Sequence, residues 1–361
     1  AAAAGAAEWP QLPLTMIDAS LERARGHRIT VKDLARQLGM SVSTVSRAFY
    51  RDAVIAPETR ARILKHAAEI GYQPNPLARG LITKSSRIVG IIVSDITNPF
   101  YPEVLTRLTS RIQALDFNVM LVVTDPLRNE DETVRVLLSY HPDVVIILAA
   151  TLSSAASQAC RDAGTPVVFF NRYGSDQHSC VVTCDNEGGG RMAADHLIDL
   201  GHERLGFVAG LADASTNVDR WKGFCARCVE RGLPAPVSSE AHEFSYGAGY
   251  AAARRLLSAE RRPTALFCAN DILAIGAMDA ARREFGLSIP EDLSIVGFDD
   301  IAMASWSSHN LTTIRQPTDL MIEQTVELAS SLTRESAGRQ AMLRIPGEMV
   351  ERSTTRRYHG G

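Results

Sequence analysis

Residues 30–51 read TVKDLARQLGMSVSTVSRAFYR, two short amphipathic segments that meet at Gly39. Thr30 and Asp33 have the spacing of a capping box, and apolar residues follow at helical spacing. Gly39 favours the end of that helix, and Ser41 suits the N-cap of a second one. This stretch therefore predicts two short helices joined by a tight turn.

The second predicted helix has an apolar side and a polar side. Its apolar residues recur at helical spacing and are expected to pack inward, which leaves the polar side exposed. A helix in the major groove directs its N-terminal side chains at base edges, and arginine matches the two acceptors of guanine. An ordinary helical hairpin with a solvated polar face is the alternative. The side chains on the exposed side are Val42, Ser43, Ser46 and Arg47.

A third helix is predicted over residues 57–70, PETRARILKHAAEI. Pro57 suits the first turn of this helix, and Gly71 suits its end. Ala56 takes the N-cap without a side-chain acceptor, which weakens that end by roughly 0.5–2 kcal/mol relative to serine. Three short helices of this kind predict a compact headpiece. The side chains expected to face inward from the third helix are Ile63, Leu64, Ala67 and Ile70.

The segment YQPNPLARGLITK follows the third helix at residues 72–84, and an apolar strand begins at Ile88. With the helix-turn-helix before it, this order of motifs resembles the lactose-repressor (LacI/GalR) family of bacterial transcription regulators. The resemblance implies a hinge helix that orders on operator DNA and inserts Leu81 into the minor groove, where apolar wedges kink the duplex. A buried linker side chain is the alternative role for Leu81. The residues assigned to DNA binding are Thr30, Ser41, Val42, Ser43, Ser46, Arg47, Asn75, Ala78, Arg79 and Leu81.

The charge of the chain is divided unevenly along its length. Residues 23–87 contain 13 lysines and arginines against 4 acidic residues, a net charge of +9. The whole chain has a net charge of −3, so the remaining residues have −12. Basic segments bind phosphates by releasing counterions, so this asymmetry predicts salt-dependent DNA binding by the N-terminal segment.

From Ile88 onward, apolar strand-like runs alternate with amphipathic helices. Runs such as IVGIIVSD, FNVMLVVTD and LSIVGFDD are expected to be buried on both faces, which predicts parallel sheets between layers of helices. Eight or more such units exceed one small sheet. The predicted fold class is α/β, with a three-helix helix-turn-helix headpiece, a hinge helix and two Rossmann-like lobes. The resemblance implies that these lobes are of the periplasmic-binding-protein type.

The predicted domain limits follow from these motifs. The N-terminal extension is residues 1–27, expected to be disordered, and the headpiece is 28–74. The hinge helix and linker are residues 75–86, and an effector-binding and dimerisation domain is 87–361. Within that domain, the N-lobe is about 87–185 and 317–344, and the C-lobe is about 186–316 and 345–361.

Polar residues follow several of the predicted strands. Ligands of open α/β sheets bind beyond the carboxyl ends of the strands, so these residues are effector-site candidates on geometry alone. The candidates found in this way are Ser94, Asp95, Asn171, Asn270 and Asp299. The resemblance adds Phe100, Tyr101, Thr216, Arg220, Phe244 and Gln316 to the effector site.

The chemistry of this set favours a polyol effector. Carboxylates and amides bind hydroxyl groups, and an aromatic ring covers the apolar face of a sugar. Arg220 also suits a carboxylate or phosphate. Arg172 could either face the pocket or pair with a surface carboxylate, so a neutral sugar and a sugar acid are both kept as alternatives for the effector. Helix capping is the alternative role for Asn270 and Asp299.

Signatures of other protein classes are absent from the sequence. It contains no G-x-x-x-x-G-K-[ST] loop, no G-x-S-x-G elbow and no H-E-x-x-H pair, so we predict no enzyme, no cofactor and no metal. No apolar run reaches about 18 residues and no secretory signal is recognisable, which favours a cytoplasmic protein. Packing roles are assigned to the glycines Gly188, Gly189 and Gly190, to Cys180, Cys184, Cys225 and Cys228, and to His196 and His202.

Together these features predict a sequence-specific DNA-binding transcriptional regulator, a repressor by the resemblance, that a small metabolite controls allosterically. Its predicted partners are pseudo-palindromic double-stranded operator DNA, a sugar or sugar acid, and a second copy of itself in a homodimer, with no membrane. A solute-binding protein of a transport system shares the two-lobed fold and is the alternative function. Residues 28–84 argue against that alternative, because transport needs no headpiece.

Overall fold

The computed structural model describes residues 29–49, 53–73, 85–94, 96–124, 130–148, 154–174, 180–332 and 340–358. The chain divides into two compact units, one within residues 1–83 and the other within residues 84–361. The predicted extension at residues 1–27 and most of the predicted hinge at residues 75–86 lie outside the described residues.

The N-terminal unit contains three helices, α2 (Val31–Leu38), α3 (Val42–Ala48) and α4 (Pro57–Glu69). The predicted caps are confirmed. Thr30 and Asp33 form a capping box at α2, which ends at Gly39 with a φ of 64°, and Ser41 accepts a hydrogen bond from the Thr44 amide at the start of α3. Ala56 at α4 makes no side-chain cap, as expected. The core of this unit is Leu34, Ala35, Leu38, Val45, Ala48, Ile63 and Ala67.

One inward residue of the third helix was predicted wrongly. Leu64 is 42% exposed, whereas Ile63 and Ala67 are buried. Ile63 and Ala67 are four residues apart and lie on one side of α4, and Leu64 is turned about 100° away from Ile63 around the helix axis. An apolar residue beside the core stripe therefore points to solvent.

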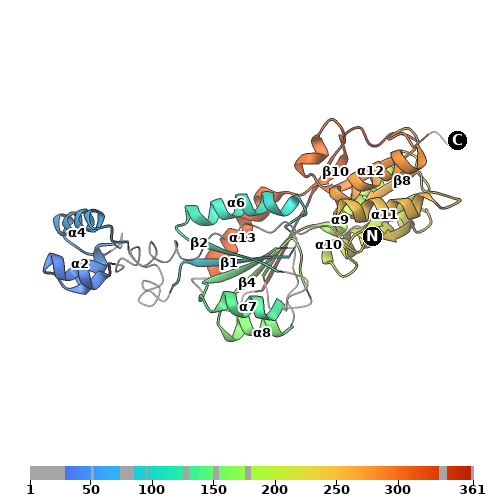
Figure 1. Cartoon of the computed structure of the whole chain (residues 1–361). Helices are drawn as coiled ribbons and strands as arrows, with labels where there is room; N and C mark the ends of the chain where they lie inside the picture. Colours follow the sequence, from blue (N-terminus) through green and yellow to red (C-terminus); the bar gives the residue numbers. More distant parts are fainter. Residues whose placement is uncertain are drawn as a thin grey trace, which may run out of the picture. The chain divides into compact units, whose positions relative to one another are not determined.

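The first of two six-stranded sheets in the C-terminal unit is entirely parallel, in the order β11-β5-β4-β3-β1-β2. Helices α6 and α13 cover one face, and α7 and α8 cover the other (Figure 1). The helices are α6 (Phe100–Ala114), α7 (Glu130–Leu138), α8 (Ser154–Asp162) and α13 (Thr318–Leu332). The strands are β1 (Ile88–Val93), β2 (Asn118–Val123), β3 (Val144–Leu148), β4 (Val167–Phe170), β5 (Cys180–Cys184) and β11 (Ala341–Ile345).

The second sheet has the order β12-β10-β9-β8-β6-β7, and only β12 is antiparallel to its neighbour. Its strands are β6 (Leu205–Ala209), β7 (Val237–Glu240), β8 (Ala265–Cys268), β9 (Ser294–Asp299), β10 (Thr312–Arg315) and β12 (Glu348–Val350). Its helices are α9 (Asn186–Asp199), α10 (Ser215–Glu230), α11 (Tyr246–Leu257), α12 (Asp271–Phe285) and the 3-10 turn η1 (Ala302–Ser305).

These two sheets confirm the predicted α/β class with a helix-turn-helix unit and two Rossmann-like lobes. The chain passes from one sheet to the other three times, after β5, after β10 and after β11. Three separate connections join the lobes, so a shift of one lobe against the other acts on all three strand ends.

The burial of the strands follows their place in the sheet. Central strands such as β3 and β6 are buried throughout, as predicted from their apolar sequences. The prediction was wrong for β2, where Leu121 is 45% exposed and Val123 is 48% exposed. β2 is the last strand of its sheet, and an edge strand lacks a neighbour to cover it.

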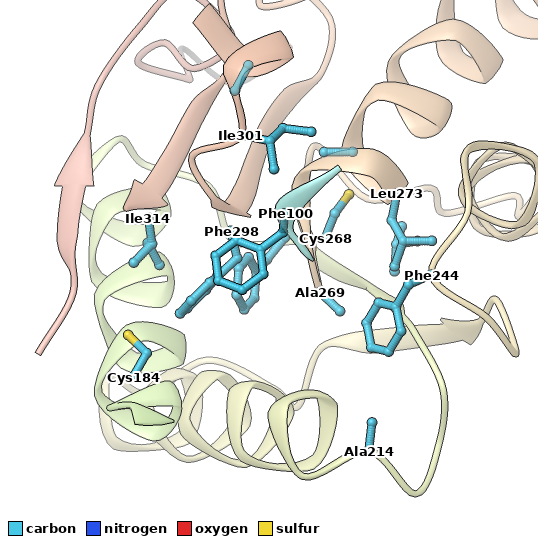
Figure 2. Packing of buried hydrophobic residues seen from close by; sticks show 14 of the residues in the cluster. Phe100, Cys184, Ala214, Phe244, Cys268, Ala269, Leu273, Phe298, Ile301 and Ile314 are labelled. Carbon is cyan, nitrogen blue, oxygen red and sulfur yellow. The ribbon is translucent and has the colours of Figure 1, made fainter. Parts of the chain in front are cut away.

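Buried apolar side chains fill the space between the second sheet and its helices. Figure 2 shows Phe298 beside Ile314 and Cys184, with Cys268 and Phe244 further along the same cluster. Among the described residues no helix is long and apolar enough to cross a membrane.

His202 connects the C-terminal segment to the second sheet. Its ring hydrogen-bonds with Thr264 Oγ1 at 3.0 Å and Ser294 Oγ at 2.9 Å, and it stacks on Tyr358 with 5.3 Å between ring centroids. Burial lowers the pKa of His202 to about 4. This arrangement confirms a structural role for His202.

The lowered pKa of His202 predicts acid destabilisation. The unfolded chain binds the imidazole proton near pH 6.5 but the folded chain only near pH 4, so the free energy of unfolding should fall as the pH is lowered through that window, by about 3 kcal/mol. Above pH 7 the group contributes no pH dependence. Urea unfolding at a series of pH values measures the slope, and His202→Gln should flatten it. An unchanged slope in the variant would assign the acid sensitivity to other groups, such as His196, whose pKa is also lowered by burial.

Candidate DNA-reading helix and effector site

The outer side of α3 presents the side chains predicted to face DNA. Val42 is 42% exposed, and Ser43 and Arg47 are also exposed, whereas Ser46 is half-buried. The Arg47 Nε donates to the Ser43 carbonyl oxygen at 3.4 Å, so both residues lie on one side of the helix. Because Val45 and Ala48 are fixed in the core of the unit, this side of α3 is held outward.

Two other residues of the DNA-binding prediction serve as helix caps. The Thr30 hydroxyl donates to the Asp33 carboxylate at 2.7 Å, and the Ser41 hydroxyl accepts from the Thr44 amide at 3.1 Å. These contacts position the starts of α2 and α3. The remaining DNA-binding candidates lie outside the described residues; they are Asn75, Ala78, Arg79 and Leu81.

Arg220 on α10 is the centre of the candidate effector site. It is only 2% exposed, and its guanidinium carbon, Cζ, lies 3.5 Å from the centre of the Phe298 ring. Its Nε donates to Asn186 Oδ1 at 2.8 Å, its Nη1 to the Ala269 carbonyl at 2.5 Å, and its Nη2 to Asp299 Oδ1 at 3.3 Å. Residues from three different strand ends thus hold one guanidinium.

Asp299 connects Arg220 to the crossover after β10. Its Oδ1 also accepts from Gln316 Nε2 at 2.7 Å, and Asp299 and Gln316 are both buried. The backbone of Asp299 has a φ of 113°, an uncommon value for a residue other than glycine. Strained backbone of this kind gathers at functional sites, where surrounding contacts hold it in place.

A chain of hydrogen bonds leads from Asn186 to the first sheet. Asn186 Nδ2 donates to Thr183 Oγ1 at 3.1 Å, and the Thr183 hydroxyl donates to the Asn171 carbonyl at 2.7 Å. Asn171 Nδ2 then donates to the Tyr101 hydroxyl at 3.0 Å. Asn171 has a φ of 70°, which asparagine tolerates better than most residues. One polar network therefore extends from α6 in the first lobe to the crossover after β10.

The loop after β4 contacts the second lobe directly. The Arg172 guanidinium lies 4.6 Å from the centre of the Phe244 ring and 5.8 Å from that of Tyr101, and Arg172 is only 5% exposed. The next residue, Tyr173, donates from its hydroxyl to Asp219 Oδ2 at 2.6 Å. The sequence left Arg172 either facing the pocket or pairing with a surface carboxylate. In the structure its side chain is buried among the effector-site candidates.

The pKa values at this site reflect burial first. Burial raises the pKa of Asp299, and the Arg220 guanidinium opposes that rise. Burial lowers the pKa of Arg220, and Asp299 acts in the opposite direction. Burial also raises the pKa of Tyr101, with Arg172 opposing it and Asp299 adding to it. Groups of both lobes therefore share one electrostatic environment.

The other effector-site candidates have several kinds of surroundings. Asn270 is the N-cap of α12, where its side chain accepts from the Leu273 amide at 3.1 Å, which is the alternative role stated for it. Thr216 is buried in the first turn of α10, and Ser94 is half-buried after β1. Phe100 is packed in the apolar core (Figure 2). Asp95 lies outside the described residues.

Two residues of this region were missed by the sequence analysis. Asn186 bridges Arg220 and Thr183, and Asp271 is fully buried, accepting from Thr313 Oγ1 at 2.5 Å and from the Ile301 amide at 2.9 Å. Burial raises the pKa of Asp271 well above its ordinary value, and Asp299 adds to the rise. Both residues start helices after strands, and that position was the only available signal.

Two oxygen atoms at the site have no hydrogen-bond donor although they are buried. They are Asn171 Oδ1 and Gln316 Oε1, and their side chains are among the most buried polar groups of the protein. A buried polar atom without a partner costs about 1–3 kcal/mol, so such atoms are rare outside sites that receive a ligand or water. Both atoms are acceptors, and a ligand that fits them has to donate.

The glycines and cysteines to which the sequence assigned packing roles lie in packed parts of the lobes. A Cβ atom on Gly190 would lie 2.2 Å from the Arg220 carbonyl oxygen, so this glycine allows α9 and α10 to approach closely. No disulfide joins any two of the six cysteines, all of which lie in the described residues, and burial raises the pKa of Cys184 to about 12. Within the described part of the chain, no group of three or more His, Cys, Asp or Glu residues has the arrangement of a metal site.

Comparison with protein families gives two matches. Residues 30–75 match the family described as bacterial regulatory proteins, lacI family, and residues 194–355 match a periplasmic binding protein-like domain. The HTH-type transcriptional repressor CytR of Escherichia coli (strain K12) is 31% identical over 324 residues, which cover 89% of this chain and 89% of that protein.

Solved structures of similar fold include regulators bound to DNA and to a sugar. The lac repressor dimer bound to operator and the anti-inducer ONPF has 27% identity and a TM-score of 0.80, covering 91% of this chain and 99% of that one. The complex of the transcriptional regulator CelR with cellobiose has 26% identity and a TM-score of 0.70, covering 91% of this chain and 100% of that one.

Proposed function

This chain belongs to the LacI family of bacterial regulatory proteins, and on that premise we propose which residues read operator DNA and which bind the effector. The predicted function as a DNA-binding transcriptional regulator with a small-molecule effector is confirmed at the level of the family. Nothing supports the alternative of a transport protein, and the relatives are regulators rather than enzymes.

We assign DNA reading to the outer side of α3. Val42 and Ser43 are positioned to contact base edges, and Arg47 supplies the two donors that match guanine. The protein acts as a homodimer, like the repressor dimer on its operator, so each copy reads one half of a pseudo-palindromic site. In this proposal Leu81 is the minor-groove wedge, and the protein acts in the cytoplasm.

We assign effector binding to the polar network between Tyr101 and Gln316. The observation that supports this assignment is the pair of buried acceptors without donors, Asn171 Oδ1 and Gln316 Oε1. Hydroxyl groups of a polyol donate to such acceptors, and the Phe244 ring covers an apolar sugar face. A sugar is therefore the proposed effector, and the cellobiose complex of a structural neighbour is consistent with this class.

The effector also provides the allosteric link. Its contacts come from both lobes, because Tyr101 and Asn171 lie with the first sheet and Arg220 and Asp299 with the second. A ligand that contacts both lobes favours the conformation in which they are closest. Operator affinity then changes by as much as the affinity of the ligand differs between the two conformations.

A thermal-shift screen of the full chain tests the effector class. Neutral sugars, sugar acids and sugar phosphates are each added in excess, and a ligand at about 100 times its dissociation constant should stabilise the folded protein by about 2.7 kcal/mol. Stabilisation by neutral sugars alone supports the polyol assignment. Stabilisation by acids or phosphates alone would mean that Arg172 or Arg220 recognises an anion, and no stabilisation by any sugar would refute the assignment.

The variant Gln316→Leu is expected to lose effector stabilisation while remaining folded. It removes a donor to Asp299, which costs stability, and a buried acceptor without a partner, which restores some, so its free energy of unfolding without ligand should change by no more than about 1 kcal/mol. Its affinity for the sugar found in the screen should fall about tenfold or more. Gln324→Leu, at a half-buried glutamine of α13 that hydrogen-bonds to Glu327, is the control and should keep the ligand-induced shift. Equal shifts in both variants would remove Gln316 from the site.

A further inference from the structure

Asp143 receives a cluster of hydrogen bonds from the beginning of the described C-terminal unit. Its Oδ1 accepts from the Ser86 amide at 2.7 Å and from Ser86 Oγ at 2.9 Å. Its Oδ2 accepts from the Arg87 amide at 3.1 Å and from Ser85 Oγ. A single carboxylate thus holds three consecutive residues, with both of its oxygens occupied by donors.

The residue at the end of this cluster has an unusual backbone. Arg87 has a φ of 54°, a left-handed conformation that few residues other than glycine adopt. Such a conformation costs about 1–3 kcal/mol and persists where surrounding contacts enforce it. The Asp143 carboxylate provides one such contact through the Arg87 amide. The Arg87 carbonyl provides another by accepting from the Asn118 amide at 2.8 Å.

The cluster also fixes the starts of adjacent strands. Asp143 immediately precedes β3, and its own amide donates to the Ile88 carbonyl, the first residue of β1, at 2.8 Å. On the other side, the Arg87 side chain lies 5.3 Å from the centre of the Phe117 ring, just before β2. Residues 85–87 are therefore held between the amino ends of β3 and β2.

β1 connects this cluster to the candidate effector site. The strand is six residues long, or about 20 Å. It begins after Arg87 and ends just before Ser94. It pairs with β2 on one side and β3 on the other, so it moves as part of the sheet. Ser85 and Ser86 are the last two residues of the segment in which the sequence predicts the hinge and linker.

We propose that Asp143 is a positioning residue for operator binding, which fixes the direction in which the chain leaves the first sheet towards the hinge and so transmits movements of that lobe to it. The inference rests on the proposed function as a regulator with a hinge. Asp143 contacts neither DNA nor effector in this role. Its carboxylate sets the geometry of Ser86 and Arg87, and β1 relates that geometry to the effector-site end of the sheet.

The test uses the full chain with Asp143→Asn and the matched control Asp116→Asn. In Asp143→Asn the side chain keeps one acceptor oxygen, and an NH₂ group replaces the other oxygen and faces the donors around it. Asp116 is exposed in the turn before β2, and its φ of 61° is one that asparagine tolerates, so Asp116→Asn should leave the fold unchanged. Both changes remove one negative charge from the same end of the lobe, so they affect non-specific DNA attraction alike. A duplex selected from a random library by the wild-type protein serves as operator.

Asp143→Asn is expected to bind the selected duplex at least tenfold more weakly than the wild type, and to bind a duplex of unrelated sequence as well as Asp116→Asn does. Hydrogen exchange at the Ser86 and Arg87 amides should be faster in Asp143→Asn only. If Asp143→Asn proves poorly folded, a double variant, Ser85→Ala with Ser86→Ala, replaces it, because it removes two donors without altering the carboxylate. Its affinity for the selected duplex should lie between that of the wild type and the value expected for Asp143→Asn.

Three outcomes are decisive. Weakened operator binding with retained non-specific binding supports the positioning role. Operator affinity equal to that of Asp116→Asn, despite faster exchange at Ser86 and Arg87, overturns it while leaving the regulator function intact. If the wild-type protein itself enriches no sequence from the library, the proposed function fails, and the role of Asp143 in operator binding fails with it.

Discussion

Replacing Arg220 with alanine is expected to cost the folded protein about 3–5 kcal/mol and to abolish effector binding. The guanidinium is buried and donates to Asn186, Ala269 and Asp299, so its removal leaves the Asp299 carboxylate buried without its cation. Breaking a buried ion pair in this way costs several kcal/mol, mostly as the desolvation of the remaining charge. Urea unfolding measures the first effect, and the thermal-shift screen measures the second.

Two further variants separate folding from ligand binding. Arg191→Ala is the matched control, because Arg191 pairs with Glu230 on the surface of the same lobe, where solvent screens the ion pair and its loss should hardly change the stability. Arg220→Met combined with Asp299→Asn removes both buried charges and should recover much of the stability without restoring effector binding. If Arg220→Ala were as stable as Arg191→Ala, the buried network would not have the structural importance assigned to it.

Sequence patterns predicted those features that depend on neighbouring residues. Thr30 and Asp33 are three residues apart, and Ser41 caps the helix that immediately follows it, so local chemistry sufficed for the caps of α2 and α3. Periodicity failed where burial depends on the rest of the fold. Leu64 is apolar but lies beside the core stripe of α4, and the apolar strand β2 is an edge strand with exposed residues.

The effector site shows the same limit. Some candidates, such as Asp299, could be proposed because parallel strands end at one edge of a sheet, and others, such as Arg220, came only from the family resemblance. The hydrogen-bond partners of these candidates could not be predicted. Arg220 contacts Asn186, 34 residues earlier, and Asp299, 79 residues later. Only the folded chain shows that Asn186 belongs to this network and that Arg172 is buried against Phe244. The two acceptors without donors, on Asn171 and Gln316, are likewise a property of the fold and have no sequence signature.

Arg47→Ala is expected to weaken operator binding by about 1–3 kcal/mol for each half-site, and hence by roughly 2–6 kcal/mol for a homodimer on a two-fold operator. The physical reason is the loss of two donors to guanine from the exposed side of α3. The fold of the N-terminal unit should be unchanged, because Arg47 is exposed and, among the residues that the structure describes, its side chain hydrogen-bonds only with the Ser43 carbonyl. Fluorescence anisotropy with the selected duplex, at one fixed salt concentration, measures the loss.

Sequence preference distinguishes base reading by Arg47 from simple charge attraction. Arg36→Ala on α2 removes the same charge from the same unit, where Arg36 pairs with Asp33 at 3.3 Å. That control should weaken binding to all duplexes alike, because a contact with phosphate has no sequence information. Arg47→Ala should instead lose its preference for guanine at one position of each half-site. If the two variants lost affinity uniformly and kept the same preferred sequence, Arg47 would be a phosphate contact, and base reading would have to be assigned to other side chains of α3.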